Sequence, residues 1–206
     1  MNALGFHLAR FLRLEWPLAT LSVPQSELIA ALAGKTVALV GNARSLVERD
    51  EGFAIDAADI VIRINRAPMP ASRTHGTRCD WLALATSISA ADLGRLNPDR
   101  LLWMSHKRKR LPWLAAKQSG FYLHPQSDWR ALRDKLGAPP TTGLMMIDLL
   151  TRSDLDRLTL HGFDFFASQS LTGRRRADQV PHDFIAEKEY VETLMAHDTR
   201  VHQEGK

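Results

Sequence analysis

The chain has 206 residues, of which 45% are hydrophobic and 24% are charged, the proportions of a soluble globular protein with one sizeable core. Its formal net charge of +4 admits anionic partners such as nucleotides, acidic glycans, lipid head groups or nucleic acid, without selecting among them. The single cysteine, Cys79, excludes an intrachain disulfide, and no apolar run is as long as a membrane span.

An amphipathic helical segment is predicted over residues 1–34, ahead of a domain over 35–206. Leu4, Leu8 and Phe11 lie near one helical face, with arginines and Trp16 beside them. This face can pack on the chain's own domain or on a partner subunit, or residues 1–20 can lie on an anionic membrane surface. Charged residues interrupt the segment, unlike a signal peptide, so we expect a cytoplasmic protein, either free or peripheral at the inner face of the cell membrane.

Strands and helices alternate along the rest of the chain. Helical patterns separate the apolar runs, and a capped helix precedes the last apolar run. This alternation predicts a single doubly wound, mostly parallel α/β sheet with helices on both faces. The expected strands are residues 37–40, 60–64, 81–85, 101–104, 121–123 and 158–163. The expected helices are residues 25–33, 45–49, 90–96, 112–117, 129–136 and 144–150, with a last helix after residue 182.

Two strand ends carry candidate ligand-binding residues. The first strand leads into Gly41, Asn42, Ala43 and Arg44, where a tight turn before a helix would present N–H groups to an anion. The second strand leaves Asn65 beyond its carboxyl end, where ligands of open α/β sheets bind. Neither a dinucleotide fingerprint nor a P-loop is present, so an ordinary buried strand and turn is the alternative interpretation.

A second candidate anion- or nucleotide-binding turn precedes the helix at 144–150. Either Thr141 or Thr142 can cap that helix, and Gly143 allows its backbone to approach a ligand closely. A well-capped buried helix is the alternative here. Further along, a polar stretch with three consecutive arginines at 174–176 precedes His182 and Glu187 at the start of the last helix.

Taken together, three segments resemble the CMP-sialic-acid-dependent sialyltransferases, glycosyltransferase family 29, in a bacterial-type form. The sequences VALVGNA at 37–43, DIVIRINRAP at 59–68 and GTR at 76–78 are similar to the family's long motif. The sequences PTTG at 140–143 and LTLHGF at 158–163 are similar to its small motif, and His182 with Glu187 matches its very short motif. The motifs occur in the family's order, and the resemblance covers roughly residues 35 to 195.

The resemblance implies a Rossmann-like, GT-A-like fold and an inverting transferase that moves a sialic acid or related sugar acid from a CMP donor to an oligosaccharide or glycolipid hydroxyl. Histidine titrates near neutral pH and suits a general base, so His182 is the expected base, while Glu187 organises the last helix or the site. The carried-over donor-binding residues are Gly41, Asn42, Ala43, Arg44, Asn65, Thr141, Thr142 and Gly143. CMP leaves with one phosphate, so no metal is expected.

Several features depart from the family pattern. Animal members join two cysteines at positions that correspond here to Val37 and Leu155, and their third motif has no clear counterpart before residue 181. We therefore expect Arg174, Arg175 and Arg176 to close over the CMP phosphate as a cationic lid, with an exposed basic loop as the alternative. Asp154 and Asp156 match the Asp-x-Asp pattern of metal-dependent glycosyltransferases, but they precede a strand and are expected to be solvated turn residues.

Three other functions stay open at this point. Kdo is also carried as a CMP ester, so a CMP-Kdo-dependent transferase of bacterial surface polysaccharide fits the same motifs. A catalytically inactive CMP-binding protein also fits, given the absent third motif. A nucleic-acid binder would rest on the basic charge alone, and no recognisable nucleic-acid motif supports it.

Overall fold

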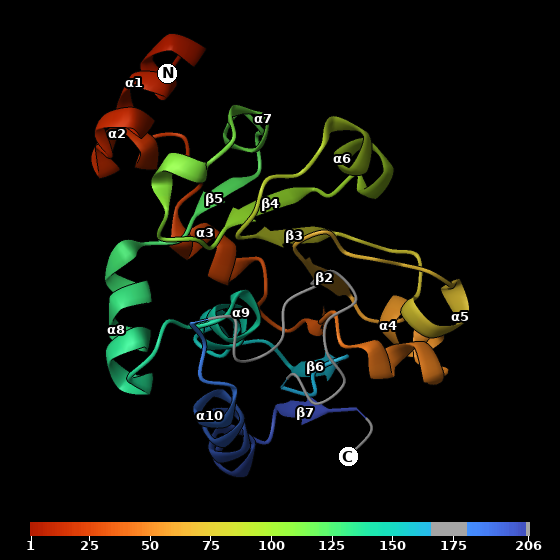
Figure 1. Ribbon diagram of the computed structural model, residues 1–206. Helices are drawn as coiled ribbons and strands as arrows, with labels where there is room; N and C mark the ends of the chain where they lie inside the picture. The colour runs from red at the N-terminus through yellow and green to blue at the C-terminus, as the bar shows by residue number, and fades with distance from the viewer. Residues whose placement is uncertain (166–180, 205–206) are drawn as a thin grey trace.

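The computed structural model describes residues 1–165 and 181–204. Its strands form one parallel sheet of seven strands in the order β5-β4-β3-β2-β1-β6-β7 (Figure 1). The strands are β1 (Thr36–Val40), β2 (Ile60–Ile64), β3 (Trp81–Leu84), β4 (Arg100–Trp103), β5 (Phe121–Leu123), β6 (Arg157–His161) and β7 (Val201–Gln203). The predicted doubly wound α/β sheet is confirmed, and every strand pair is parallel.

Helices cover both faces of this sheet. The described α-helices are α1 (Ala3–Leu12), α2 (Glu15–Ala19), α3 (Gln25–Ala30), α4 (Gly52–Asp56), α5 (Ser72–His75), α6 (Ala90–Leu96), α7 (Trp113–Ala116), α8 (Gln126–Leu136), α9 (Thr142–Leu150) and α10 (Phe184–His197). Short 3-10 helices are η1 (Arg44–Glu48) and η2 (Arg108–Arg110). Buried residues of α3, α8, α9 and α10 share one hydrophobic cluster, and those of α1, α2, α6 and α7 share another on the opposite face.

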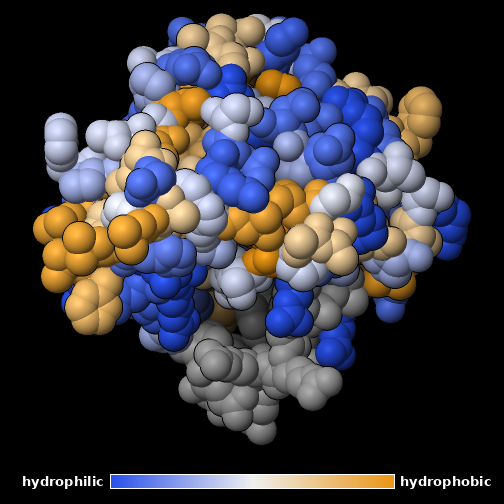
Figure 2. Space-filling view, turned by 90° about the horizontal axis from the view of Figure 1, so that it is seen from above, coloured by the Kyte–Doolittle hydropathy of each residue, from blue (hydrophilic) through white to orange (hydrophobic). Residues whose placement is uncertain are grey.

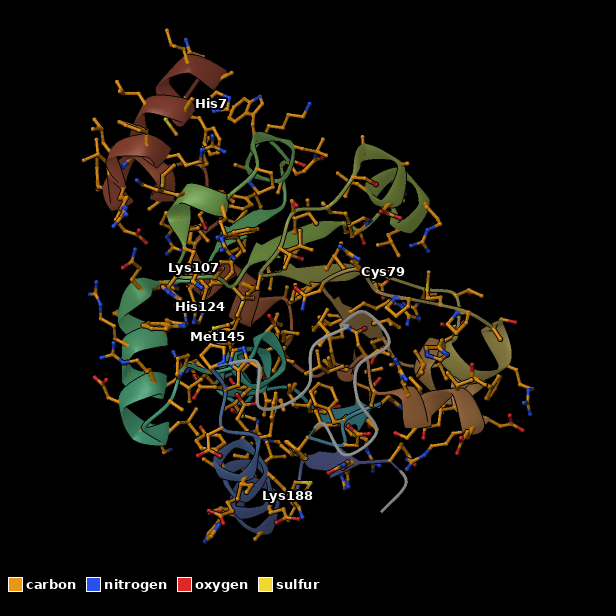
Figure 3. The ribbon with its side chains drawn as sticks, viewed as in Figure 1. His7, Cys79, Lys107, His124, Met145 and Lys188 are labelled. Atoms are coloured by element: carbon orange, nitrogen blue, oxygen red, sulfur yellow. The ribbon has the colours of Figure 1, made fainter. Side chains whose placement is uncertain are left out.

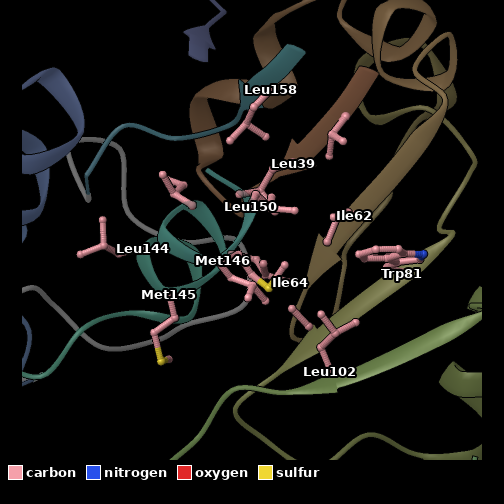
Figure 4. Close-up of a cluster of buried hydrophobic side chains, with 14 of the residues drawn as sticks. Leu39, Ile62, Ile64, Trp81, Leu102, Leu144, Met145, Met146, Leu150 and Leu158 are labelled. Atoms are coloured by element: carbon pink, nitrogen blue, oxygen red, sulfur yellow. The ribbon is translucent and has the colours of Figure 1, made fainter. Parts of the chain in front are cut away.

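Strand β1 shows why helices must cover both faces of the sheet. Val37 and Leu39 belong to the cluster beneath α9, whereas Ala38 and Val40 pack with Leu46 on the other face. This alternation reflects the two-residue period of a strand, and because both faces are buried the run is apolar throughout. Helix α9 is buried on nearly all sides and lies against the central strands (Figure 4). The buried helix α9 therefore supports the central strands, whose carboxyl ends lead to the candidate site residues.

The N-terminal segment packs on the domain. The N–H of Val23 donates to the carbonyl of Phe121 (2.7 Å), and the N–H of Leu123 donates to the hydroxyl of Ser22 (2.8 Å). These bonds cover β5, which would otherwise be an unpaired edge strand. Phe6 on α1 is fully buried in the cluster beside β5. Residues 1–34 therefore share the core of the domain that follows.

Some elements differ from those predicted. Residues 45–49 form most of a 3-10 helix rather than an α-helix, and the helix at 25–33 ends at Ala30 before a turn that closes at Gly34 with φ 66°. The sequence also gave no sign of α4, α5 or β7, which are too short to show a period. Val37 and Leu155, at the positions of the animal cysteines, are both buried in the cluster beneath α9.

The GTR segment of the long motif is structural. Gly76 has φ 65°, and a side chain there would meet the carboxylate of Asp56. That carboxylate accepts hydrogen bonds from the backbone N–H groups of Thr77 and Arg78. The guanidinium of Arg78 then donates to the carbonyls of Asp56, Ala58 and Asp59. This network fixes the start of β2, at the amino-terminal ends of the strands and so opposite their carboxyl ends.

Two further features concern the described helices and the single cysteine. None of the described helices combines the length and the apolar character that crossing a bilayer requires. Cys79 is a buried free thiol at the β3 side of the molecule, away from Met145 on α9 (Figure 3). Burial raises the pKa of the Cys79 thiol to about 12, so this residue is not a reactive nucleophile.

Candidate active site

The order in which the chain adds strands to the sheet reverses between β1 and β6. From β1 the chain adds β2, β3, β4 and β5 outward on one side, and then returns to place β6 on the other side of β1. Such a switch point opens a crevice beyond the carboxyl ends of the two strands, which is where α/β proteins bind ligands. The predicted turn at residues 41–44 follows β1 at this point.

Backbone contacts fix the turn after β1 to the end of β6. The N–H of Gly41 donates to the carbonyl of His161 (2.7 Å), and the N–H of Ala43 donates to the carbonyl of Gly162 (3.2 Å). A Cβ on Gly41 would lie 2.3 Å from the Gly162 carbonyl oxygen, so only glycine fits. The expectation that this turn offers its N–H groups freely to a phosphate is therefore wrong for Gly41 and Ala43, whose N–H groups bond the end of β6 instead.

Two asparagines line the neighbouring strand ends. The side-chain N–H of Asn42 donates to the carbonyl of Ile64 (3.2 Å), directly before Asn65. Asn65 has φ 54°, a left-handed conformation that asparagine tolerates better than most residues, and its side-chain oxygen accepts a hydrogen bond from the N–H of Ala85 (2.9 Å). With that oxygen engaged, the amide NH₂ is the end of Asn65 that suits a phosphate or carboxylate oxygen.

Phe163 brings the second predicted turn to the first. A Cβ on Gly143 would lie 2.7 Å from Cε1 of the Phe163 ring, and a Cβ on Gly41 would lie 3.2 Å from Cδ2 of the same ring. The ring therefore lies against both glycines, at the start of α9 and after β1. Segments about 100 residues apart in the sequence are thus adjacent across one aromatic side chain. Thr142, between the capping residue and Gly143, is buried.

Glu187 binds the residue that caps α9. Its two carboxylate oxygens accept hydrogen bonds from the backbone N–H of Thr141 (2.6 Å) and from the Thr141 hydroxyl (2.7 Å). The same hydroxyl accepts a hydrogen bond from the N–H of Leu144 (3.2 Å), which makes Thr141 the N-cap. Burial raises the pKa of Glu187 to about 7, against the hydrogen bonds from Thr141, which lower it. Glu187 thus organises the α9 turn.

His182 is held by the same segment. Its Nδ1 lies 2.7 Å from the carbonyl oxygen of Pro139. Because a carbonyl only accepts, Nδ1 carries the proton, and in the neutral ring Nε2 keeps its lone pair. Asp183 then caps α10 by accepting from the N–H groups of Ile185 and Ala186. The loop at 139–141 therefore contacts Glu187 on α10 and His182, which directly precedes the cap of α10.

Other predicted residues are exposed or lie outside the described ranges. Arg44 is exposed at the start of η1. The three arginines at 174–176 lie outside the described residues, as does most of the stretch that corresponds to the family's third motif. Asp154 and Asp156 are exposed at the amino end of β6, on the opposite edge of the sheet. Within the described residues, no three His, Cys, Asp or Glu side chains are grouped to hold a metal.

The sequence did not reveal the parts played by Pro139, Gly162 and Phe163. Gly162 has φ 64° and directs the chain from β6 into Phe163. The run Gly162-Phe163 in the small motif was visible, but the two glycines that its ring touches lie far away in the sequence. The Pro139 carbonyl is a backbone group and carries no signal in the sequence.

Comparison with known proteins agrees with this architecture. The model of glycosyltransferase family 29 (sialyltransferase) matches residues 18–116. A mammalian sialyltransferase in complex with Gal-β1-3GalNAc-ortho-nitrophenol has a TM-score of 0.64 at 18% identity, with 98% of this chain and 79% of that chain covered. The sialyltransferase CstII of Campylobacter jejuni with CMP has a TM-score of 0.57 at 14% identity, with 83% and 80% covered. No curated protein matches the chain by sequence.

The family match and the shared fold both point to the glycosyltransferase class. Within that class, the resemblance to the sialyltransferase family is confirmed over residues 18–116, and the sialyltransferase fold extends over nearly the whole chain. The matched range includes the turns at Asn42 and Asn65 but not the α9 turn or His182, so the roles of these last residues rest on the geometry described above.

Proposed function

We propose that this protein transfers a sialic acid or a related sugar acid from a CMP donor to a hydroxyl of a glycan, with inversion and with His182 as general base. One observation carries the proposal: the Phe163 ring packs against Gly41 and Gly143, while the loop before Gly143 holds His182. The segments that the resemblance assigns to donor binding and to catalysis thus lie beside one another. The CstII structures with CMP and with CMP-3FNeuAc have this fold.

The donor would lie across the switch point. The amide groups of Asn42 and Asn65 are neutral donors suited to the phosphate and carboxylate oxygens of a CMP sugar acid. Thr142 and Gly143 would contact the ribose and cytosine side, with Thr141 supporting the turn. Arg44 at the start of η1 and the arginines at 174–176 are the cations proposed to approach the phosphate, the latter as a lid.

His182 would act on the acceptor. The acceptor O–H bond breaks and its proton moves to Nε2, while the oxygen forms a bond to the anomeric carbon of the sugar. The bond from that carbon to the donor phosphate breaks, and its electron pair leaves with CMP. The Pro139 carbonyl favours this direction because it binds Nδ1–H and stabilises the ring as it becomes positively charged. Glu187, with both oxygens engaged by Thr141, is a positioning residue.

We propose that the reaction needs no metal. CMP leaves with a single phosphate, which Asn42, Asn65 and nearby cations can neutralise by hydrogen bonds and charge. The Asp154 and Asp156 pair, the one sequence match to a metal-binding pattern, lies at the other edge of the sheet. We further propose a cytoplasmic location, consistent with a single cysteine that is buried and unpaired.

A donor assay tests the proposal and separates its alternatives. The wild-type protein and the His182→Ala variant are incubated with CMP-sialic acid or with CMP-Kdo, with and without a galactose-terminated oligosaccharide, and CMP release is measured. Acceptor-dependent release from CMP-sialic acid, lost in the variant, is the expected result, whereas release from CMP-Kdo alone would identify Kdo as the sugar. If wild-type protein binds CMP but releases none from either donor, the inactive CMP-binding alternative is correct.

A further inference from the structure

Helices α1 and α2 present a row of apolar side chains to solvent, and we propose that this surface binds the head-group region of an anionic phospholipid bilayer. The N-terminal apolar patch consists of Leu4, Leu8, Phe11, Leu12, Leu14 and Trp16. Leu4 is 80% exposed and Trp16 is 79% exposed. Figure 2 shows apolar surface gathered at the left of the molecule, over α1 and α2, next to hydrophilic residues.

The domain does not need these side chains for its own core. On α1 the core contacts are made by Phe6 and Ala9, which are buried, and the Phe6 ring packs on Trp113 with 5.0 Å between ring centroids. From α2, Leu18 makes the contact with the core and is fully buried. The N-terminal apolar patch therefore lies on the faces turned away from the core. It also precedes residue 18, where the family match begins.

A cationic strip borders the patch. It consists of the exposed Lys107, Lys109 and Arg110, with Arg10 and Arg13 beside them on the N-terminal segment. The ammonium of Lys109 lies 5.5 Å from the centroid of the Phe11 ring, and the Arg10 guanidinium donates to the carbonyl of Leu111 (3.0 Å). Figure 3 places Lys107 on the same side of the molecule as α1 and α2. Apolar and cationic side chains thus form one continuous surface.

Buried contacts hold this surface in place. Arg108, within the basic run, is buried and its Nε donates to a carboxylate oxygen of Glu15 at the start of α2 (2.9 Å). Its other nitrogens donate to the carbonyls of Ser105 and His124, just beyond the ends of β4 and β5. The ion pair neutralises Glu15, the acidic residue of α2. The strip therefore keeps its positive charge and is rigidly joined to the carboxyl edge of the sheet.

The positive charge of the surface favours an anionic bilayer over a second copy of the chain as its binding partner. A second copy of the chain docked symmetrically would bring two cationic strips together, which is unfavourable, whereas an anionic bilayer complements the strip. Tryptophan and leucine side chains bordered by lysine and arginine are the combination that enters the boundary between head groups and acyl chains. β5 is four strands from β1, or about 19 Å at ordinary strand spacing, so a docked protein would hold its candidate active site near the membrane surface.

Vesicle co-sedimentation of the full chain tests this proposal without depending on catalysis. The probes are vesicles of phosphatidylcholine and vesicles of phosphatidylcholine with phosphatidylglycerol. One variant removes apolar contact, L8Q/F11Q/W16Q, and another removes charge, K107Q/K109Q/R110Q. The matched controls are F53Q, which changes an exposed phenylalanine on α4, and K35Q/K135Q/K188Q, whose cations lie away from the strip; Figure 3 shows Lys188 at the far end from α1.

We expect the wild-type protein and both controls to bind the anionic vesicles and not the neutral ones. The charge variant should bind on the order of 100-fold more weakly, because each cation at an anionic surface contributes about fivefold. The apolar variant should also lose binding while keeping its circular dichroism spectrum and thermal midpoint, since the altered side chains are exposed. Equal sedimentation with both vesicle types, or unchanged binding by either variant, overturns the proposal. So does a wild-type dimer in light scattering that the apolar variant dissociates, with no vesicle binding.

Discussion

The Nδ1 atom of His182 lies 2.7 Å from the carbonyl oxygen of Pro139, two residues before the cap of α9. This one hydrogen bond fixes both the tautomer of the imidazole and its place beside the turn that carries Gly143. It also shows how the proposed base and the proposed donor-binding turn depend on each other. A displacement of the loop at 139–141 would move His182 as well, because Glu187 and His182 both bind that loop.

The first prediction separates basicity from position at His182. In His182→Asn the side-chain NH₂ can still donate to the Pro139 carbonyl, but no nitrogen is left to accept a proton. We expect the variant to keep wild-type CMP affinity and thermal stability while its acceptor-dependent turnover falls by about two to four orders of magnitude. Calorimetric CMP titration and a CMP-release assay measure the two quantities. Turnover within a few-fold of wild type in His182→Asn would remove this residue as the base.

The second prediction concerns the contact between Gly143 and Phe163. Gly143→Ala places a methyl group 2.7 Å from the ring, so we expect a loss of about 1–3 kcal/mol in the free energy of unfolding and weaker CMP binding. Adding Phe163→Leu removes the clashing ring atom and should restore part of both. Gly94→Ala on α6, with open space around its Cβ, is the control and should be neutral or stabilising. Additive effects in the double variant would show that ring and glycine do not interact.

The third prediction concerns the pH dependence of stability through Glu187. Its pKa in the folded protein is about 7, above the ordinary value of 4.5, so folding favours the protonated form. This contribution to stability is fully present below pH 4.5 and is lost as the pH rises through 7, a change of about 3 kcal/mol at most. We expect urea unfolding of Glu187→Gln to lack this loss. The exposed Glu189→Gln on the same helix should follow wild type, and a parallel pH profile in Glu187→Gln would refute the assignment.

The fourth prediction addresses Asn65. Asn65→Asp keeps an oxygen for the Ala85 N–H and tolerates the left-handed backbone, but it replaces the amide NH₂ with negative charge. We expect thermal stability close to wild type and CMP affinity at least about tenfold lower, since a charge-assisted donor is exchanged for repulsion. Asn97→Asp, a left-handed residue at the end of α6, is the matched control and should bind CMP normally. Unchanged CMP affinity in Asn65→Asp would place the donor phosphate elsewhere.

The sequence predicted what local pattern determines. The apolar runs predicted strands β1 to β6 because burial on both faces leaves few polar residues, and Gly137 marked the end of α8 in its left-handed conformation. β7 was missed because its three residues include His202 and Gln203, which have no apolar pattern. The Phe163 contacts and the Pro139 hydrogen bond could not be predicted, because both depend on where distant segments meet.

The position of β6 has a consequence for the growing chain. β1 is bonded along one side by β2 and along the other by a strand that begins only at Arg157. Until that later strand is made, the apolar sequence TVALV would present an open edge of unpaired backbone groups at what becomes the middle of the sheet. Nascent chains and truncations that end before Arg157 are therefore the forms most prone to aggregate, even though they contain the complete family-matched range.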